Sequence, residues 1–291
     1  MRNHVKLFEA WLNEEESEGP KKIKDMLSMP YDKFVTSLKD GAKDPKVEAV
    51  LNMGKGDGTP DDEEVEVKEI DIPAENLFPT QSQIGMDNSL GYLREKDPTG
   101  VEKLIKGDLS GFLNNRILTA NGKWILDGHH RWSQVYLFNP KAKIPALDLN
   151  LPGLSEMDLL KVVQSAIAAT YKNVNQTEAD APTDIFDDKR MPEKDLPKKI
   201  AEIAGPQVIQ VAKKAWGMKE DDEVVKKMVD NALSIKSKKP KQAPAREYMP
   251  QPTATALDSG RSKQQATDYK GMPKEFIDKL KSGDVNFKPP F

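Results

Sequence analysis

Two of the three histidines in this chain of 291 residues stand next to each other and beside an arginine, in the run Asp127-Gly-His-His-Arg131. Imidazole groups bind anions or transfer protons, and a guanidinium group is a permanently charged, planar donor. Gly128 lets the backbone approach a ligand closely. The run is therefore where the sequence most favours chemistry, and an anion such as a phosphate group is the ligand it predicts.

The residues around this run predict the elements that position it. Ile117–Ala120 and Lys123–Leu126 have the composition of short strands, and Asn121-Gly122 between them is a strong hairpin signal. Trp132–Phe138 has apolar residues at helical spacing, and Ile144–Leu149 reads as a further strand. The first backbone N–H groups of the expected helix face the loop, which suits a phosphate group.

A purely structural explanation competes with this one. Asp127 can cap the helix, with the two histidines packed or hydrogen-bonded in its first turn. A metal site is not favoured, because neighbouring residues on one helical turn point in different directions and the chain has no cysteine. The third histidine is the distant His4. Residue types alone leave ligand binding and helix capping both open.

The run is part of a longer pattern that resembles the ParB/sulfiredoxin superfamily, in particular the ParB-like proteins of phages. The pattern consists of Lys68–Gln81, which ends in a Leu-x-Pro-Thr-Gln box, then Asp127–Arg131 and Ile144-Pro145. It covers about residues 65–150. The resemblance implies an α+β fold, in the form of a small mixed-sheet domain. It also implies that the loop binds the phosphates of a nucleotide (ATP, ADP or CTP), with or without Mg²⁺ as a cofactor.

The resemblance also implies roles for individual residues. Those expected at the ligand are, for catalysis, Asp127, His129 and His130, and, for binding the nucleotide, Gly128, Arg131, Thr80, Gln81 and Ser82. Without the resemblance, the three polar residues after Pro79 would be interpreted as a turn. Ser89 and a helix over Thr99–Ile105 are expected to complete the wall of the pocket.

The branches of the superfamily differ in chemistry, and this chain departs from several of them. Sulfiredoxin needs a cysteine in the loop, so its activity is excluded. Partition proteins carry a loop rich in glutamate and arginine and a helix-turn-helix domain, neither of which is evident here. The free serine kinase branch shares the Asp-Gly-His-His-Arg form but has a carboxylate near Gln81, and an amide cannot act as a general base. The remaining candidates for a base are Glu69, Asp71, Glu75, Asp87 and Glu102.

The N-terminal residues favour a second class of function. Val5–Leu12 has the spacing of an amphipathic helix, for which docking is the simplest interpretation. Lys6–Glu14 resembles N-terminal segments of virion proteins in large tailed phages, and Leu12-Asn-Glu14 matches the Leu-x-Glu pattern after which their prohead proteases cut. This resemblance implies capsid or other virion proteins as partners and a place in the virion. The alternative location is the host cytoplasm.

Composition limits the other partners. Lys and Arg number 44 against 47 Asp and Glu, a net charge of −3, so a large basic surface for nucleic acid is only weakly supported. No apolar run is long enough to predict a membrane span. The sequence therefore leaves two functions open. One is a nucleotide-dependent phosphotransferase or phosphate-ester hydrolase, including nuclease-like activity. The other is a virion-associated or DNA-associated binding protein without turnover.

The predicted organisation is a small globular domain with long extensions. Helices are expected after the cap at Ser155, over Leu196–Ala204 and Pro206–Trp216, and over Asp222–Ile235. The basic run Lys236–Lys241 is interpreted as a solvated linker rather than a contact to nucleic acid. The expected parts are a helical N-terminal extension (1–53), an acidic, glycine-rich linker (54–64), the ParB/sulfiredoxin-like domain (65–150), a helical region (151–235), a disordered linker (236–271), and a C-terminal helix and tail (272–291).

Overall fold

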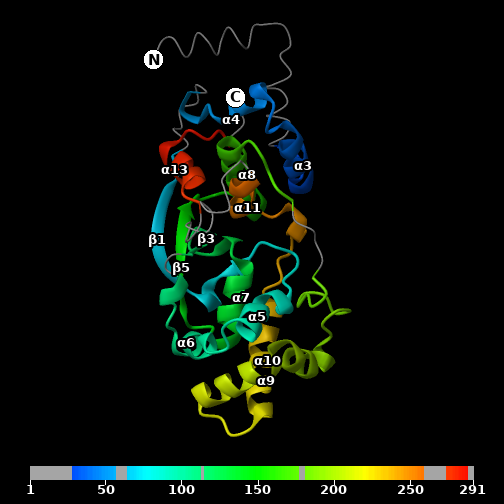
Figure 1. The fold of residues 1–291 in the computed structure, drawn as a ribbon. Coiled ribbons are helices and arrows are strands. Elements are labelled where there is room, and N and C mark those ends of the chain that lie inside the picture. Colours follow the sequence, from blue (N-terminus) through cyan, green and yellow to red (C-terminus); the bar gives the residue numbers. More distant parts are fainter. Residues whose placement is uncertain (1–27, 57–63, 113–114, 177–180, 259–272, 288–291) are drawn as a thin grey trace. The chain divides into compact units, whose positions relative to one another are not determined.

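The computed structural model describes residues 28–56, 64–112, 115–176, 181–258 and 273–287 (Figure 1). These residues belong to two compact units. The central unit comprises Lys68–Asp148 and Glu178–Glu247, and the terminal unit comprises Met1–Val67, Leu149–Thr177 and Tyr248–Phe291. The expected N-terminal helix, His4 and the Leu12-Asn-Glu14 pattern lie outside the described residues.

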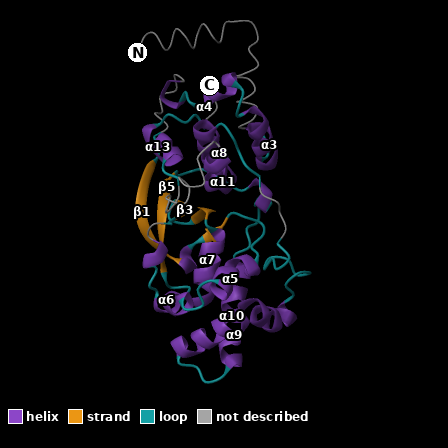
Figure 2. Cartoon of the chain, in the orientation of Figure 1, coloured by secondary structure: helices purple, strands orange, loops and turns teal. Residues whose placement is uncertain are grey.

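The chain has the predicted α+β class, with many helices and one mixed sheet of five strands (Figure 2). The order across the sheet is β1-β5-β3-β4-β2. β2 is parallel to β4, whereas β3 is antiparallel to β4. The strands are β1 (Glu66–Pro73), β2 (Phe78–Pro79), β3 (Ile117–Ala120), β4 (Trp124–Asp127) and β5 (Lys143–Asn150).

The helices of the central unit share one hydrophobic core with this sheet. They are α5 (Met86–Glu95), α6 (Gly100–Lys106), α7 (His129–Phe138), α9 (Leu196–Trp216) and α10 (Asp221–Ser237), with short 3-10 turns η2 (Ala74–Asn76), η3 (Ser110–Phe112) and η4 (Glu193–Asp195). α7 supplies the fully buried Trp132, whose indole nitrogen donates to Ala74 O at 2.9 Å. α9 is broken at Gly205, where φ is 73° and ψ is 164°, so its two parts match the two helices that the sequence predicts.

The terminal unit is built around the buried helix α8 (Glu156–Tyr171). Ser155 caps it as predicted, since its Oγ accepts from the Asp158 N–H at 3.2 Å. The other helices are α3 (Tyr31–Gly41), α4 (Pro45–Leu51), α11 (Pro252–Asp258) and α13 (Glu275–Ser282), all of which pack against α8, and a 3-10 turn is η1 (Gly54–Gly56). The 3-10 turn η5 (Arg246–Tyr248) spans the boundary between the two units in the sequence. No helix in the described ranges is long and apolar enough to cross a membrane.

The hairpin and the strand-to-helix junction form where the sequence predicts them. Asn121 and Gly122 both have positive φ, 54° and 64°, as the turn between β3 and β4 requires. The Asp148 carboxylate fixes this turn by accepting from the Gly122 N–H at 2.9 and 3.0 Å. β4 then ends at Asp127, and α7 begins at His129 after the left-handed Gly128.

The expected disorder of residues 236–271 is wrong for residues 236–258, while residues 259–271 lie outside the description. α10 continues to Ser237, and α11 follows at Pro252–Asp258. Lysines hold this part of the chain in place: Lys236 Nζ, at the end of α10, lies 2.5 Å from the Asp188 carboxylate, and Lys239 Nζ, after α10, donates to Phe186 O at 2.8 Å. The composition of this segment is that of a solvated linker. The contacts that fix it are made with residues far away in the sequence, so composition does not reveal them.

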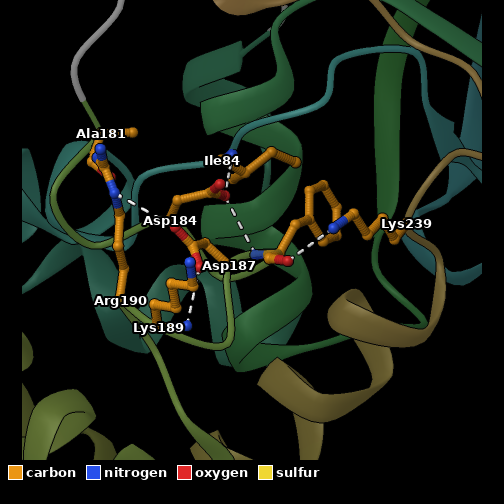
Figure 3. Close-up of polar contacts among 8 residues, drawn as sticks. Ile84, Ala181, Asp184, Asp187, Lys189, Arg190 and Lys239 are labelled. Carbon is orange, nitrogen blue, oxygen red and sulfur yellow. Dashed lines mark hydrogen bonds and ion pairs between the residues drawn. The ribbon is translucent and has the colours of Figure 1, made fainter.

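A second long-range connection joins residues 181–190 to the segment between β2 and α5 (Figure 3). The buried Asp184 carboxylate accepts from the backbone N–H groups of Ile84, at 2.9 Å, and Phe186, at 3.1 Å. Burial raises its pKa, and the two N–H groups act in the opposite direction. Residues 178–247 are thus part of the same compact unit as residues 68–148, although the sequence predicts a domain limited to 65–150.

Candidate functional site

The Asp127–Arg131 run lies where β4 passes into the first turn of α7. Successive residues on one helical turn point in different directions, so the two histidines and the arginine meet different surroundings. Gly128 is the residue before the helix, and no side chain caps it. The alternative in which Asp127 caps α7 is therefore not realised.

His129 points into the protein. Its Nε2 accepts from the backbone N–H of Thr80 at 3.1 Å, while Thr80 Oγ1 donates to Ile125 O at 2.5 Å. Burial lowers the pKa of His129 to about 3, so the ring is neutral at pH 7, as an accepting Nε2 requires. These bonds tie the end of β2 to β4 and α7, which is a structural role.

His130 has a different environment. Its Nδ1 lies 3.4 Å from Ser89 Oγ, which is itself 2.6 Å from Ser133 Oγ. Its Nε2 is buried and has no hydrogen-bond partner among the described residues. Burial lowers the pKa of His130 to about 4, the positive charge of Arg246 adds to that effect, and Asp87 opposes it. His130 is therefore a neutral ring with one unused nitrogen.

Arg131 is held on two sides. Its Nη1 donates to Asn115 Oδ1 at 2.9 Å and to Arg116 O at 3.0 Å, and its Nη2 lies 3.3 Å from Asp127 Oδ2. Burial raises the pKa of Asp127, whereas the charge of Arg131 lowers it. Because 22% of the Arg131 side chain remains exposed, the guanidinium is both anchored and reachable.

A pocket of about 500 Å³ lies beside this first turn of α7, between α5 and α6. It is lined by Asn88, Ser89, Tyr92, Leu93, Asp97, Gly100, Lys103, Leu104, Asp108, Gly111, Asn115, His130, Arg131 and Gln134. Its volume is in the usual range for small-molecule sites. The side chains include two cations, two carboxylates and several neutral hydrogen-bonding groups, an arrangement suited to a polar ligand.

The pocket brings some of the predicted site residues together and leaves others outside. His130, Arg131, Ser89 and residues of α6 line it, as the sequence predicts. The predicted residues that do not line this pocket are Asp127, Gly128, His129, Thr80, Gln81 and Ser82. Thr80 instead supports His129, the Gln81 amide donates to Gln83 O, and the Ser82 N–H donates to Pro244 O at 3.1 Å.

Several residues of the pocket are missed by reasoning from the sequence, Tyr92 among them, and Lys103 is covered only as part of the predicted wall helix Thr99–Ile105. Lys103 is an exposed cation on α6, and Tyr92 on α5 is 63% exposed. Tyr92 is the single exposed large hydrophobic side chain in the part of the chain that the structure describes. A lysine on a helix surface carries no local signal of binding, and Tyr92, which stands among apolar residues in Leu90-Gly-Tyr-Leu-Arg94, reads as part of the packed face of a helix.

The carboxylates of the pocket differ from those that the sequence proposes as bases. None of Glu69, Asp71, Glu75, Asp87 and Glu102 lines it, although Asp87 is close enough to influence the pKa of His130. Asp97 and Asp108 do line it. Among the described residues, no group of three or more histidine, cysteine, aspartate or glutamate side chains is placed to hold a metal ion.

In comparisons with known proteins, no family model, no curated protein and no solved structure matches the chain.

Proposed function

We propose that the pocket between α5, α6 and α7 binds a phosphate-bearing ligand. The observation that carries this proposal is that Lys103 of α6 and Arg131 of α7 line the same pocket, beside the first turn of α7. Two cations and the positive end of a helix dipole attract an anion. The neutral imidazoles of His129 and His130 add no charge at pH 7, so the anion is held by the lysine and the arginine.

A nucleotide such as ATP, ADP or CTP fits this pocket better than a small inorganic anion does. A volume of about 500 Å³ leaves room beside the phosphates. Tyr92 offers an exposed ring on which a base can stack, and Asn88 and Gln134 offer amide groups for its edge. Mg²⁺ arriving with the nucleotide would find the carboxylates of Asp97 and Asp108 in the wall.

We also propose that the chain is a member of the ParB/sulfiredoxin superfamily. Three features support it: the mixed sheet, the tight turn at Gly128 between β4 and α7, and the pocket beside His130 and Arg131. In such a protein, phosphoryl transfer consists mainly of positioning and charge neutralisation, for which the pocket has cations and the unused Nε2 of His130.

Binding without turnover is the competing function. A general base works best when its pKa is near the working pH, and the pKa of His130 is lowered to about 4. The carboxylates that the sequence offers as bases lie outside the pocket. Release of phosphate from ATP, measured for the wild-type protein and for a His130→Ala variant, distinguishes an enzyme from a binding protein. Phosphate release that is present in the wild type and lost in the variant supports an enzyme.

Calorimetry with ATP, ADP and CTP tests the binding proposal directly. We expect the wild type to bind one of them, and Lys103→Ala, Arg131→Ala and His130→Ala each to weaken binding at least about tenfold. Lys106→Ala is the matched control, because Lys106 lies on the same helix but pairs with Glu102 at 2.6 Å, away from the pocket wall. No binding of any of the three nucleotides to the wild type would overturn the proposal.

A further inference from the structure

A second group of residues in the central unit combines aromatic rings with ammonium groups. Phe78 on β2 and Trp124 on β4 are register partners in the parallel pair, and their ring centroids are 5.8 Å apart. Lys123 Nζ lies 4.4 Å from the centroid of the Trp124 ring and 5.3 Å from that of Phe78. Lys238 Nζ lies 3.9 Å from the Phe78 centroid. Together with Lys241, these residues are called the aromatic–lysine surface.

This surface lies at an edge of the sheet. β2 is the last strand in the order β1-β5-β3-β4-β2 and is only two residues long. The chain after α10 is held beside it at two points. Lys238 Nζ donates to Glu75 O at 2.7 Å, before β2, and Pro244 O accepts from the Ser82 N–H at 3.1 Å, after β2. Lys241 is on the stretch between these two points, so the basic run is held at the edge strand.

The lysines of this surface are not neutralised by ion pairs. Within the described ranges, no carboxylate is in salt-bridge contact with Lys123, Lys238 or Lys241. Lys236 differs, because it pairs with Asp188, whereas Lys239 is turned away from this surface to Phe186 O, to which it donates, as Figure 3 shows. Lys123 and Lys238 thus lie beside partly exposed rings, and the exposed Lys241 follows on the same stretch of chain. The Glu75 charge acts on Lys238, so Lys123 and Lys241 are the ammonium groups with most positive charge to offer a ligand.

We propose that the aromatic–lysine surface binds single-stranded nucleic acid. Rings beside lysines are the combination that such strands need, since bases stack on aromatic faces while ammonium groups neutralise the phosphates. Trp124 is partly exposed and supplies the stacking face, once the flexible, exposed Lys123 moves from the ring to a phosphate. A duplex is not the expected partner, because its bases are already stacked on one another and it would meet only the lysines.

The proposed strand site is separate from the nucleotide pocket. No residue of the aromatic–lysine surface lines that pocket. The two proposals therefore fail independently: a variant of this surface leaves nucleotide binding unchanged, and Lys103→Ala leaves strand binding unchanged.

Fluorescence anisotropy of a labelled oligo-dT strand with the full chain tests the proposal. We expect binding at low salt, weakened about tenfold by Trp124→Leu and by Lys123→Gln. The slope of log K against log salt should fall by about 0.7 for each lysine removed. Lys198→Gln is the control, because Lys198 is an exposed lysine of α9 whose side chain is 81% accessible. It should bind like the wild type.

Several outcomes would overturn the proposal. These are no binding by the wild type at low salt, equal weakening in Lys198→Gln, equal affinity for a duplex of the same length, or equal affinity for a polyglutamate peptide. If Trp124→Leu does not fold, the exposed Lys123→Gln and Lys241→Gln variants still decide the question. Unchanged affinity and salt slope in both of these variants would also contradict the assignment.

Discussion

At the scale of single residues, the two adjacent histidines show how neighbours in sequence acquire different roles. His129 has its Nε2 occupied by the Thr80 N–H, whereas the Nε2 of His130 is buried in the wall of the pocket without a partner among the described residues. Both rings have a lowered pKa, mainly because burial disfavours the charged form. His129 therefore ties the end of β2 to α7, and His130 forms part of the pocket lining as a neutral ring. Arg131 and Lys103 carry the positive charge of the pocket.

The lowered pKa values predict how stability depends on pH. From the ordinary value of 6.5, the pKa falls to about 4 for His130 and about 3 for His129. Below pH 6.5 the unfolded chain takes up protons that the folded chain does not, so the free energy of unfolding falls as the pH decreases. The loss approaches about 1.4 kcal/mol per pH unit for each histidine. Urea unfolding at several pH values measures it.

His130→Asn isolates one of the two contributions. Its free energy of unfolding should depend less steeply on pH below 6.5 than that of the wild type, because one titrating ring has been removed. Carboxylates that titrate at low pH are common to both proteins and cancel in the comparison. Identical pH dependence in the two proteins, or an imidazole of His130 titrating near 6.5 by NMR, would contradict a buried neutral ring.

The sequence points to part of the candidate site at this scale. His130 and Arg131 are recognisable because histidine and arginine beside a glycine are unusual in a turn. Lys103 and Tyr92 carry no comparable signal, since either could belong to the solvated face of a helix. The resemblance assigns Thr80 to the ligand, but its backbone N–H is used by His129. Which residues of a helix or loop reach the pocket depends on how the elements pack, which residue types do not show.

At the scale of elements, the junction of β4 and α7 depends on one glycine. Gly128 has φ of 99°, a conformation that residues with a side chain rarely adopt. A Cβ there would lie 2.5 Å from Ile117 Cγ2, and Ile117 is fully buried on β3. Strain and collision together should make Gly128→Ala lower the free energy of unfolding by about 2–4 kcal/mol. Chemical denaturation measures this difference.

Gly122→Ala provides the matched control for this junction. Gly122 also has positive φ, 64°, but a Cβ there would meet nothing within 4 Å. Gly122→Ala should therefore lower the free energy of unfolding only by the backbone strain, about 1 kcal/mol. If the two variants were equally stable, the contact with Ile117 would not be what requires glycine at position 128.

Elements with local signals are predictable, and elements held by distant contacts are not. The Asn121-Gly122 turn and the Ser155 cap are encoded in a few neighbouring residues, and both form as expected. The chain after Lys236 resembles a linker in composition, yet it is fixed by Phe186 O, Glu75 O and the Ser82 N–H. Such partners lie up to 163 residues away and leave no pattern in the segment itself.

At the scale of the whole molecule, the described chain divides into a central and a terminal unit, each assembled from separated segments. The sequence predicts one modest α+β domain with helical extensions, and the extension over 178–247 shares its core. α9 packs on α5 and α6, and α10 packs on α7, so these helices cover the unit that holds the pocket. Their amphipathic pattern predicts helices but does not say which surface they cover.

The location of the whole chain can be tested through its N-terminal residues. If Leu12-Asn-Glu14 is a prohead-protease site, the protein in purified phage particles should begin at Glu15, and mass spectrometry of the particles would detect that N-terminal peptide. Glu14→Ala is the matched control, since it removes the cleavage signal and should leave the segment attached. An intact Met1 or Arg2 terminus in wild-type particles, or absence from particles altogether, would defeat the virion assignment and leave nucleotide chemistry in the cytoplasm as the better supported function.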